Sequence, residues 1–439
     1  MGLRILIASD HYPPFIGGAH RQTQLLAHEL LQRGHEVRVA TVWHVGMPDQ
    51  EDDAGVPVHR FKQIRTAVPW LARDTRQRHQ PPFPDPVTVW GLRRLIDRFQ
   101  PDIVHSHGWF CYSCAAALLG KQIPLLITAR DYAYGCPTRS LVFRSEQLCS
   151  GPAPRKCLEC AGQLYGAPKG WAAVAGVSLS GPLLKRKMMG IHSISSYVQQ
   201  MIRRDFVRKP AQPAPAGQAP LIEVVIPSFA EDESTIAEQP TTSIDRYIEQ
   251  LPKQPFILFV GALRLVKGLA QLLEAYERLV DPPTLVLIGT IEADTPQVFP
   301  PGVVVLQDFP HRAVMAAWER CIFGVIPSLW PEPLGSVVYE AMSKGKAVIG
   351  TTPGGHTDMI VDRETGLLVP VGDVDALTQA MRELIDNIEL RERLGRAARE
   401  PAKLFTASFA VPRFEQAYLQ LVEESRRVNE RSSLPLRQR

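Results

Sequence analysis

The amino-acid sequence predicts an α/β protein built on two doubly wound parallel sheets. Short apolar runs alternate with amphipathic helical patterns through both halves of the 439-residue chain, as in parallel sheets covered by helices. A chain of this length exceeds one ordinary domain of about 150 residues. Hydrophobic residues make up 45% and charged residues 21% of the chain, which is typical of a folded globular protein. We therefore expect two Rossmann-like domains that face each other across a cleft.

The apolar runs place the expected strands. Ligands of doubly wound sheets bind beyond the carboxyl ends of the strands, so the loops that follow these runs are the candidate sites. The runs of the first half are Arg4–Ala8, Glu36–Thr41, Ile103–His107 and Leu125–Thr128. Those of the second half are Phe256–Val260, Thr284–Ile288, Val303–Leu306, Gly324–Ile326, Ala347–Gly350 and Gly366–Leu368.

Changes in composition place the domain boundaries. We assign the N-terminal domain to residues 1–230 and the C-terminal domain to residues 231–410. The polar, helix-poor stretch 231–254 is the expected linker between them. A helical pattern at 411–428 follows the completed second sheet, and residues 429–439 form an expected flexible tail.

Several function classes are disfavoured by the composition. The first residues, MGLRILIASD, predict a core strand rather than a signal peptide, because an acid follows after a few apolar residues. No run approaches the roughly 20 apolar residues that a spanning helix needs. The net charge of +4 is too small to indicate a nucleic-acid partner. Seven cysteines without an export signal do not indicate a disulfide framework, so we expect a cytoplasmic protein.

Two loops have the composition of an anion site. Gly17 and Gly18 start the first helical pattern, where glycines let a backbone approach an anion closely. The spacing is not G-x-G-x-x-G, and a glycine turn without a ligand stays open as an alternative. Arg264 and Lys267 follow strand Phe256–Val260 and could neutralise a diphosphate without a metal. Two solvated surface cations are the alternative.

A pair of carboxylates brackets an expected helix start. Glu332 precedes the helix, Pro333 suits its first turn, and the amides of Leu334 and Gly335 are then free for a phosphate. Glu340 lies two turns inside, and eight helical residues span about 12 Å, comparable to the two ends of a nucleotide sugar. One carboxylate could accept hydrogen bonds from sugar hydroxyls and the other from ribose hydroxyls. A dipole-complementing Glu plus a surface Glu is the alternative.

His105 and His107 lie two residues apart in strand Ile103–His107. Because side chains alternate between the two faces of a strand, both histidines lie on the same face. His107 lies at the carboxyl end and can reach the expected cleft. His105 is expected to pack below it. A histidine at a strand end is commonly structural, so His107 is a candidate only in combination with the other motifs.

These motifs together resemble retaining glycosyltransferases of family 4, which have the GT-B fold. The resemblance rests on the E-x7-E pair, the arginine–lysine loop, the early GGA and the run LLQRGHEVRVATV. It covers most of residues 1–400 and is high in GKAVIGTTPGGHTDMIVDRETGLLVPVGD. It implies transfer of a hexose from a UDP- or GDP-sugar with retention at the anomeric carbon. The acceptor would be a glycan or lipid-linked acceptor in cell-surface polysaccharide or glycolipid synthesis, and no cofactor would be required for catalysis.

The resemblance also implies roles in the C-terminal domain. Arg264 and Lys267 bind the diphosphate and stabilise the leaving group as its charge develops. The amides of Leu334 and Gly335, which follow Pro333, assist. Glu332 orients the donor sugar, and Glu340 holds the ribose.

In the N-terminal domain, the resemblance implies that His107 touches the donor sugar and that Gly17 and Gly18 close over the phosphate. Many members have His-Asp after the fourth strand, where this chain has Arg130-Asp131. Asp131 is still expected to meet the acceptor. The helix at 411–428 resembles the one that crosses back onto the first domain in this fold.

Four cysteines lie in one insertion: Cys136, Cys149, Cys157 and Cys160. Their number and the C-x2-C spacing fit a tetrahedral structural zinc site. The insertion resembles one found in a subset of the same family. Free thiols and a redox disulfide are the open alternatives.

The apolar stretch Trp171–Leu184 ends in Lys185-Arg186-Lys187. A polybasic end on an apolar helix can dock on anionic lipid, which predicts a peripheral contact with the inner face of the membrane and suits a lipid-linked acceptor. A core helix with a solvated end is the alternative.

Two other functions stay open on the same fold. A nucleotide-sugar epimerase would release nucleotide without any acceptor. A catalytically dead, partner-binding protein with a four-cysteine metal cluster would be expected to have lost the E-x7-E pair or the Arg–Lys loop, and both are intact. The sequence leaves the donor hexose, the acceptor and the oligomeric state open.

Overall fold

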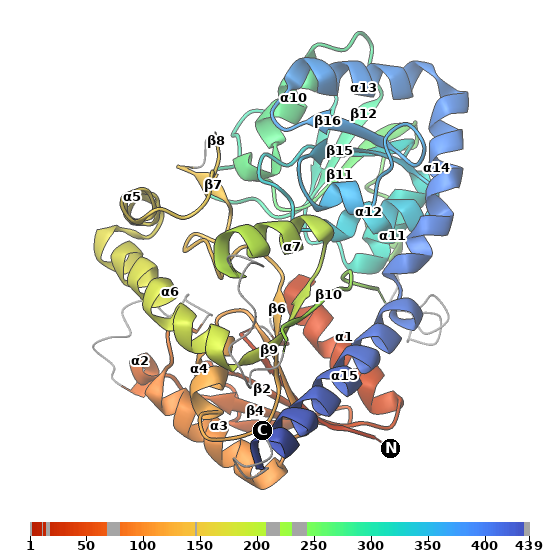
Figure 1. Cartoon of the computed structure of the whole chain (residues 1–439). Helices are drawn as coiled ribbons and strands as arrows, with labels where there is room; N and C mark the ends of the chain where they lie inside the picture. The colour runs from red at the N-terminus through yellow and green to blue at the C-terminus, as the bar shows by residue number, and fades with distance from the viewer. Residues whose placement is uncertain are drawn as a thin grey trace. The chain divides into compact units, whose positions relative to one another are not determined.

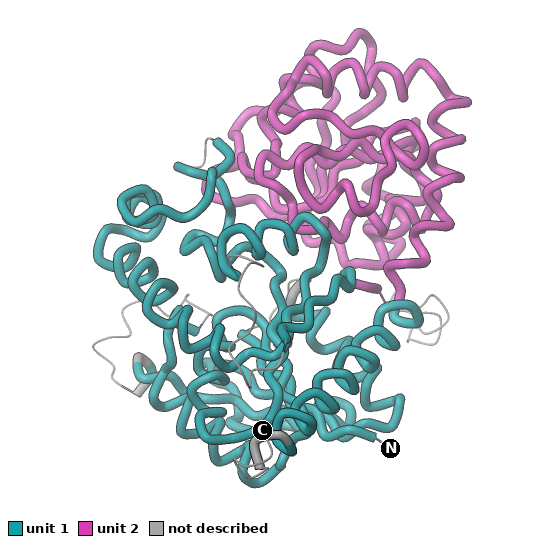
Figure 2. Tube along the Cα trace, in the orientation of Figure 1, with its two compact units in different colours: residues 1–227, 407–439 teal, residues 228–406 magenta. Residues whose placement is uncertain are grey.

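The chain folds into two compact units, which we describe separately (Figure 2). Unit 1 comprises Met1–Pro227 and Ala407–Arg439, and unit 2 comprises Ser228–Thr406. The sequence placed the corresponding boundaries after residues 230 and 410. The structure, a computed structural model, describes residues 2–10, 12–14, 18–67, 80–144, 147–207, 220–230 and 244–433. Gly17, the segment 231–243 of the expected linker and the last residues of the expected tail lie outside these ranges.

Unit 1 is built on an eight-stranded sheet with the order β10-β9-β6-β5-β1-β2-β4-β3 (Figure 1). All neighbouring strands pair in parallel except β3, which is antiparallel to β4. The central strands are buried on both faces, which explains their continuous apolar runs. The strands are β1 (Arg4–Ser9), β2 (Glu36–Val42), β3 (Gln50–Asp53), β4 (Val56–Phe61), β5 (Ile103–His107), β6 (Leu125–Ala129), β9 (Met188–Ser193) and β10 (Ile222–Val225).

Helices flank this sheet, and capping residues in the sequence explain where one of them begins. Asp85 caps one of them because its side chain accepts a hydrogen bond from the amide of Thr88, and Pro86 then occupies the first helical position. The helices are α1 (Gly18–Gln32), α2 (Ile64–Ala67), α3 (Pro86–Phe99), α4 (Phe110–Ala117), α5 (Pro154–Tyr165), α6 (Ala167–Lys187) and α7 (Ser196–Ile202), with a π-turn, η2 (Arg203–Val207), after α7.

The C-terminal helix α15 (Ala407–Ser433) belongs to unit 1, where it packs against α1 and β5 (Figure 1). Glu415 of α15 accepts hydrogen bonds from Arg33 and pairs with His35 at 2.9 Å. The hydroxyl of Tyr418 lies 2.7 Å from Nδ1 of the buried His105. The helix extends beyond the predicted 411–428 at both ends. Ala407 and Ala410 also pack inward, and residues 429–433, expected in the flexible tail, are helical.

The cysteine-containing insertion forms a two-stranded sheet of β7 (Val142–Phe143) and β8 (Gln147–Leu148), followed by the helix pair α5 and α6. The two helices lie close together because Gly170 has no side chain. A Cβ atom there would come within 2.4 Å of the backbone of Ala161. The apolar stretch Trp171–Leu184 forms the middle of α6, which extends beyond it at both ends.

Unit 2 has a six-stranded, fully parallel sheet with the order β13-β12-β11-β14-β15-β16. Its core is made of Leu, Ile, Val and Phe side chains from the strands and from α10 and α13. The strands are β11 (Phe256–Val260), β12 (Thr284–Ile288), β13 (Val303–Leu306), β14 (Phe323–Ile326), β15 (Ala347–Thr352) and β16 (Leu367–Pro370). The helices are α9 (Asp245–Ile248), α10 (Leu269–Glu277), α11 (His311–Arg320), α12 (Ser336–Ser343), α13 (Val374–Asp386) and α14 (Ile388–Ala402), with 3₁₀ turns η3 (Leu265–Lys267), η4 (Gly355–Asp358) and η5 (Lys403–Phe405).

Within the described parts of the chain, none of the helices combines the length and the apolar character needed to cross a bilayer.

Candidate functional site

The centre of the candidate site in unit 2 is the ion pair between Lys267 and Glu332. The ammonium of Lys267 lies 3.1 and 2.9 Å from the two carboxylate oxygens. Glu332 also accepts hydrogen bonds from the indole of Trp330 at 2.7 Å and from the hydroxyl of Ser328 at 2.9 Å. The carboxylate is buried, and these donors supply the hydrogen bonds that it loses with water.

The charge of Glu332 follows from these contacts. Burial by itself raises the pKa of Glu332, but the nearby Lys267 ammonium and the hydrogen bonds lower it further than burial raises it. The pKa of Glu332 therefore lies below its ordinary value, and the carboxylate is ionised at neutral pH. A charged acceptor is thus fixed in place for ligand hydroxyls.

The loop that carries Lys267 follows β11 and is tied to the end of β14. The amide of Leu329 donates to the carbonyl of Val266 at 3.0 Å. Gly268 ends the turn with a φ of 77°, and a Cβ atom there would lie 1.8 Å from the carbonyl oxygen of Pro327. Only glycine fits this contact. The close approach places Lys267 beside Glu332, although 65 residues separate them in sequence.

Arg264 has a different partner from Lys267. Its Nε lies 3.3 Å from Oδ1 of Asp294, and the amide of Leu265 donates to Oδ2 of the same carboxylate. The Arg264 side chain is half exposed, so the guanidinium is open to a ligand. Asp294 lies in the loop after β12, in which no candidate residue was predicted.

The helix α12 begins later than the sequence predicted. The expectation that Pro333 lies in the first turn is wrong, because Gly335 takes a φ of 86° and α12 starts at Ser336. The left-handed backbone conformation of Gly335 is not helical, so the residues before it belong to the loop and not to α12. The amides of Leu334 and Gly335 donate no hydrogen bond to any residue within the described ranges. These amides lie at a helix N-terminus, where backbone N–H groups favour an anion.

Sequence reasoning missed His356, which lies in the turn η4. Its ring is fully buried, and its Nδ1 accepts a hydrogen bond from the amide of Thr351 at 3.1 Å. The proton of the neutral ring is therefore on Nε2. A Cβ atom on Gly335 would lie 2.9 Å from this Nε2, so the ring packs directly against the turn before α12. Burial lowers the pKa of His356 to about 4, which keeps the ring neutral.

Glu340 forms a separate cluster with α11. Its Oε1 lies 3.3 Å from Nε2 of His311, and the indole of Trp318 donates to Oε2 at 3.3 Å. The carboxylate is buried except for about a tenth of its surface, whereas His311 is more than a third exposed. Glu332 and Glu340 thus have different partners, as expected for groups that contact different parts of one ligand.

In unit 1, His107 and Arg130 lie at the carboxyl ends of the neighbouring strands β5 and β6. The Nε of Arg130 donates to Nδ1 of His107 at 3.3 Å. Burial lowers the pKa of Arg130 to about 10, which leaves it cationic at neutral pH. His107 is only 2% exposed and His105 below it is fully buried, so His107 is covered within this unit rather than open.

Asp131 follows Arg130 and is held by Arg139. Its Oδ2 accepts hydrogen bonds from Nε and Nη2 of Arg139 at 2.9 and 2.7 Å, and its Oδ1 accepts the amide of Ala133. The neighbouring carboxylate raises the pKa of Arg139 above its ordinary value despite burial. Gly18, another predicted residue of this unit, is the first residue of α1.

Sequence reasoning also missed Asp10, which directly follows β1. Its two oxygens accept the amides of Gln80 and Trp109, both at 2.9 Å. Burial raises the pKa of Asp10 to about 7. Gly108, with a φ of 66°, would place a Cβ atom 2.5 Å from Oδ2 of Asp10, so the loop after β5 closes over this carboxyl group. An acid directly after the first strand was the available signal.

The four cysteines of the insertion are free thiols. Three of these thiols form hydrogen bonds with nearby oxygens. The partners are the Thr138 hydroxyl for Cys136, the Gly151 carbonyl for Cys149 and the Val142 carbonyl for Cys160. Among the residues that the structure describes, which include all four thiols, no three His, Cys, Asp or Glu side chains are grouped as metal ligands. Zinc at these thiols therefore stays a prediction from the sequence alone.

Comparison with known families and structures agrees with this architecture. Residues 17–212 match the model of the glycosyl transferase 4-like domain, and residues 242–401 match that of the glycosyl transferases group 1. α-Maltose-1-phosphate synthase of Mycobacterium tuberculosis is 27% identical over 323 residues, which are 68% of this chain and 73% of that protein. The two family models therefore account for most of units 1 and 2.

Solved structures show the same fold. Sucrose-phosphate synthase of Thermosynechococcus elongatus has a TM-score of 0.71 at 18% identity and covers 96% of this chain and 99% of its own. HepE of Anabaena, solved in complex with UDP, has a TM-score of 0.64 at 14% identity and covers 95% and 100%. The GT-B fold predicted from the sequence is thus confirmed, and the chain is a glycosyltransferase with a family-4-like domain and a group 1 domain.

Proposed function

We propose that this glycosyltransferase moves a hexose from a UDP- or GDP-sugar to a glycan or lipid-linked acceptor, with retention and without a catalytic metal. The observation that carries the proposal is the Lys267–Glu332 pair beside the free amides of Leu334 and Gly335. It supplies a cation and two N–H donors for a diphosphate, next to an ionised acceptor for sugar hydroxyls. The reaction would serve cell-surface polysaccharide or glycolipid synthesis in the cytoplasm, at the inner face of the membrane.

On this proposal, the donor diphosphate lies between Lys267, the exposed guanidinium of Arg264 and the amides of Leu334 and Gly335. Together they stabilise the negative charge that develops on the leaving nucleoside diphosphate. Glu332 stays oriented by Ser328 and Trp330 when Lys267 turns toward the phosphate. The buried Glu340 accepts hydrogen bonds from the ribose hydroxyls.

The acceptor binds to unit 1 at Asp131, in the loop that follows β6. Asp131 is held by Arg139 and accepts a hydrogen bond from the acceptor. The acceptor proton passes to the leaving phosphate, so no side chain is needed as the base. The names of the relatives, which include a maltose-1-phosphate synthase and a UDP complex, support a nucleotide-sugar donor.

The first test is a calorimetric panel of UDP, GDP and their common sugars with EDTA present. We expect one nucleotide to bind wild type and to lose its affinity in Lys267→Ala. Lys253→Ala, at an exposed lysine of the same unit, is the matched control and should bind as wild type. Absence of nucleotide binding in wild type would overturn the proposal and favour the partner-binding alternative.

The second test follows the products. With the bound nucleotide sugar and a crude acceptor extract, NMR should show a new glycosidic bond with the anomeric configuration of the donor. Inverted product would contradict the retaining mechanism. Conversion of the sugar without any acceptor would favour the epimerase alternative.

A further inference from the structure

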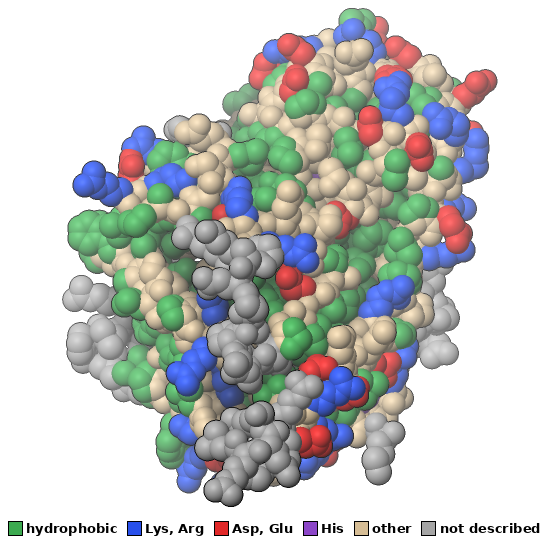
Figure 3. All heavy atoms as spheres, in the orientation of Figure 1, with side chains coloured by type: hydrophobic (Ala, Val, Ile, Leu, Met, Phe, Trp, Pro, Cys, Tyr) green, Lys and Arg blue, Asp and Glu red, His purple; other side chains and the backbone are tan. Residues whose placement is uncertain are grey.

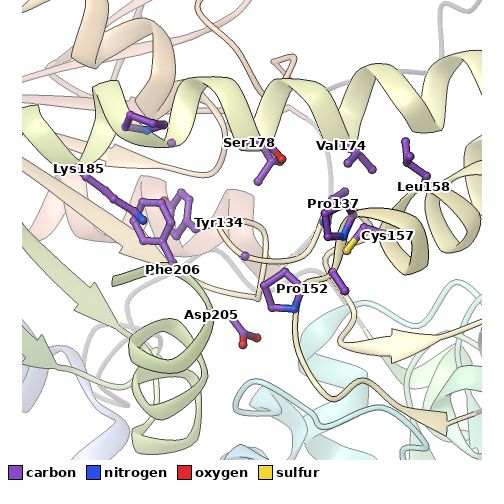
Figure 4. Close-up of a pocket in the computed structure, with 16 residues that line it drawn as sticks. Tyr134, Pro137, Pro152, Cys157, Leu158, Val174, Ser178, Lys185, Asp205 and Phe206 are labelled. Atoms are coloured by element: carbon purple, nitrogen blue, oxygen red, sulfur yellow. The ribbon is translucent and has the colours of Figure 1, made fainter. Parts of the chain in front are cut away.

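Unit 1 contains a pocket of about 380 Å³ formed by α5, α6, the π-turn after α7 and the loop that follows β6 (Figure 4). Such a volume is near the lower end of ligand pockets, which range over about 300–1,000 Å³. It has room for one slender group. Most of its lining is apolar, including Pro137, Leu158, Val174, Val177, Pro182 and Phe206.

The two helices that line this pocket, α5 and α6, carry more bases than acids. Lys185 lines it, with its ammonium 4.9 Å from the centre of the Phe206 ring. Asp205 is the one acid of the lining, and Arg204 neutralises it through two hydrogen bonds of 2.7 and 2.8 Å. The helices α5 and α6 carry one acid, Glu159, which pairs with Arg144. Their basic residues are Arg155, Lys156, Lys169, Lys185, Arg186 and Lys187.

The outer faces of the same helices are apolar and exposed. On α6, Trp171 is 56% and Leu179 80% exposed, and on α5 Leu164 is 55% exposed. Hydrophobic side chains gather over these helices on the face drawn in Figure 3, with Lys and Arg beside them. An apolar helix face with a basic end is typical of a contact with an anionic lipid surface.

The pocket is also close to the predicted acceptor residue. Tyr134 and Gly135, which line it, lie in the same loop as Asp131, three and four residues further along the chain. The hydroxyl of Tyr134 donates to the carbonyl of Thr128 in β6 at 2.8 Å, which fixes this loop on the sheet. The pocket is therefore lined in part by the same loop that carries Asp131.

We propose that the pocket binds the alkyl or isoprenyl chain of a lipid phosphate, with the phosphate group beside Lys185. The inference deepens the proposed function, on which it rests, by assigning the acceptor to glycans linked to a single-chain lipid phosphate, in which a sugar hydroxyl forms the new glycosidic bond and its proton passes to the leaving phosphate. The apolar lining takes the chain, and the excess of cations on α5 and α6 takes the anionic group. The exposed face of α6 lies against the lipid surface that supplies the acceptor.

Gly181 offers a clean way to close the pocket. It lies in α6 and lines the pocket, and a Cβ atom there would meet only the edge of the Phe206 ring at 4.0 Å. A leucine side chain at this position would therefore extend into the pocket and fill part of it. Gly181→Ala adds a single methyl group and is the matched control, since it shares the helix effect of replacing glycine.

The test is calorimetry on the full chain with dodecyl phosphate below its micelle concentration. Wild type should bind one molecule per chain, and inorganic phosphate alone should not bind. Gly181→Leu should weaken binding by about tenfold or more, because overpacking must expel the chain. Gly181→Ala should bind nearly as wild type.

A charge variant tests the headgroup separately. Lys185→Gln should weaken dodecyl phosphate but leave a neutral dodecyl maltoside unchanged. Circular dichroism and the thermal midpoint check that each variant folds. Equal binding by Gly181→Leu and wild type, equal binding of inorganic phosphate, or binding only to micelles would each overturn the inference.

These measurements contain no nucleotide, so they separate this inference from the proposed function. Lys267→Ala should bind dodecyl phosphate as wild type. If nucleotide binding is found and chain binding is not, the pocket assignment fails and the transferase proposal stands. If the chain binds and no nucleotide does, the transferase proposal fails and takes the acceptor role with it, while the chain-binding pocket stands.

Discussion

Lys267 lies 2.9 Å from Glu332, so the cation expected at the donor diphosphate is the partner of the carboxylate expected at the donor sugar. The pair is partly buried, with Lys267 29% and Glu332 10% exposed at their side chains. Removing the cation from a buried carboxylate destabilises the folded protein. The carboxylate nevertheless stays oriented if its other hydrogen-bond donors remain. The contact therefore links the stability of unit 2 to its donor site.

The first prediction concerns this pair. Lys267→Ala should lower the free energy of unfolding by about 1–3 kcal/mol, because it leaves the Glu332 charge without its cation. Glu332→Gln in the same background should recover part of the loss, since an amide needs no cation. Chemical denaturation of the two single variants and the double variant measures the coupling. Additive effects would show that the pair does not stabilise the fold.

The pH dependence has a defined sign. The pKa of Glu332 is lowered in the folded state, so its ion pair stabilises the protein above the ordinary glutamate pKa of 4.5. The stabilisation is lost as the pH falls through the folded pKa. Lys267→Ala removes the main cause of the lowered pKa, so the difference in stability from wild type should shrink in acid.

A second prediction tests the turn before α12. Gly335→Ala should reduce kcat on the order of 10²-fold, because the added methyl group meets His356 and displaces the phosphate-binding amides. Gly372→Ala is the matched control. Gly372 has a similar φ of 79°, but a Cβ atom there meets only the Leu329 side chain at 3.8 Å.

Both substitutions put an alanine into left-handed backbone and should cost about 1–3 kcal/mol of stability. Only Gly335→Ala should impair nucleotide binding. If both variants lose it equally, the effect belongs to general strain, and the amides of Leu334 and Gly335 have no special role.

The strands of unit 2 show what the sequence can predict. The runs Phe256–Val260, Thr284–Ile288 and Val303–Leu306 were predicted with their observed bounds, because a buried parallel strand is apolar throughout and ends at a turn residue. The edge strand β3, with the sequence QEDD, was missed because it has no apolar residue. The strand β9 was missed because its run MMGIHS includes a glycine and two polar residues.

The site shows the corresponding limit for side chains. Local patterns identified Lys267 and Glu332 separately, since each follows a strand. Their contact depends on the close approach of Gly268 to Pro327, which no local pattern shows. His356 was missed because a histidine after two glycines has no periodic signal, and its role depends on packing against Gly335.

A third prediction concerns the ion pair of Arg264. Asp294→Asn should change the free energy of unfolding by less than about 1 kcal/mol, because Arg264 is half exposed and its pair is screened by water. Affinity for the nucleoside diphosphate should rise, since the phosphate no longer competes with a carboxylate for the guanidinium. Titrations at low and high salt measure this, and the gain should fade at high salt.

Arg264→Lys is the companion variant. It keeps the charge but loses the planar fork that binds two phosphate oxygens, so affinity should fall. Unchanged affinity in both variants would remove Arg264 from the donor site.

The last prediction concerns Asp10, whose pKa is about 7 in the folded protein against 3.8 ordinarily. Between these values the unfolded chain has released the proton that the folded chain keeps. The free energy of unfolding should therefore fall as the pH rises from about 4 to 7 and then level off. Three pKa units correspond to on the order of 4 kcal/mol.

Asp10→Asn cannot titrate and should lack this component. The thermal midpoint of wild type, relative to the variant, should drop between about pH 4 and pH 7. Asp102→Asn is the control, because Asp102 also accepts a backbone amide, that of Arg4, but in an exposed position. A pH-independent difference between wild type and Asp10→Asn would mean that Asp10 is ionised throughout. The loop after β5 would then cover an ionised Asp10 carboxylate rather than a protonated carboxyl group.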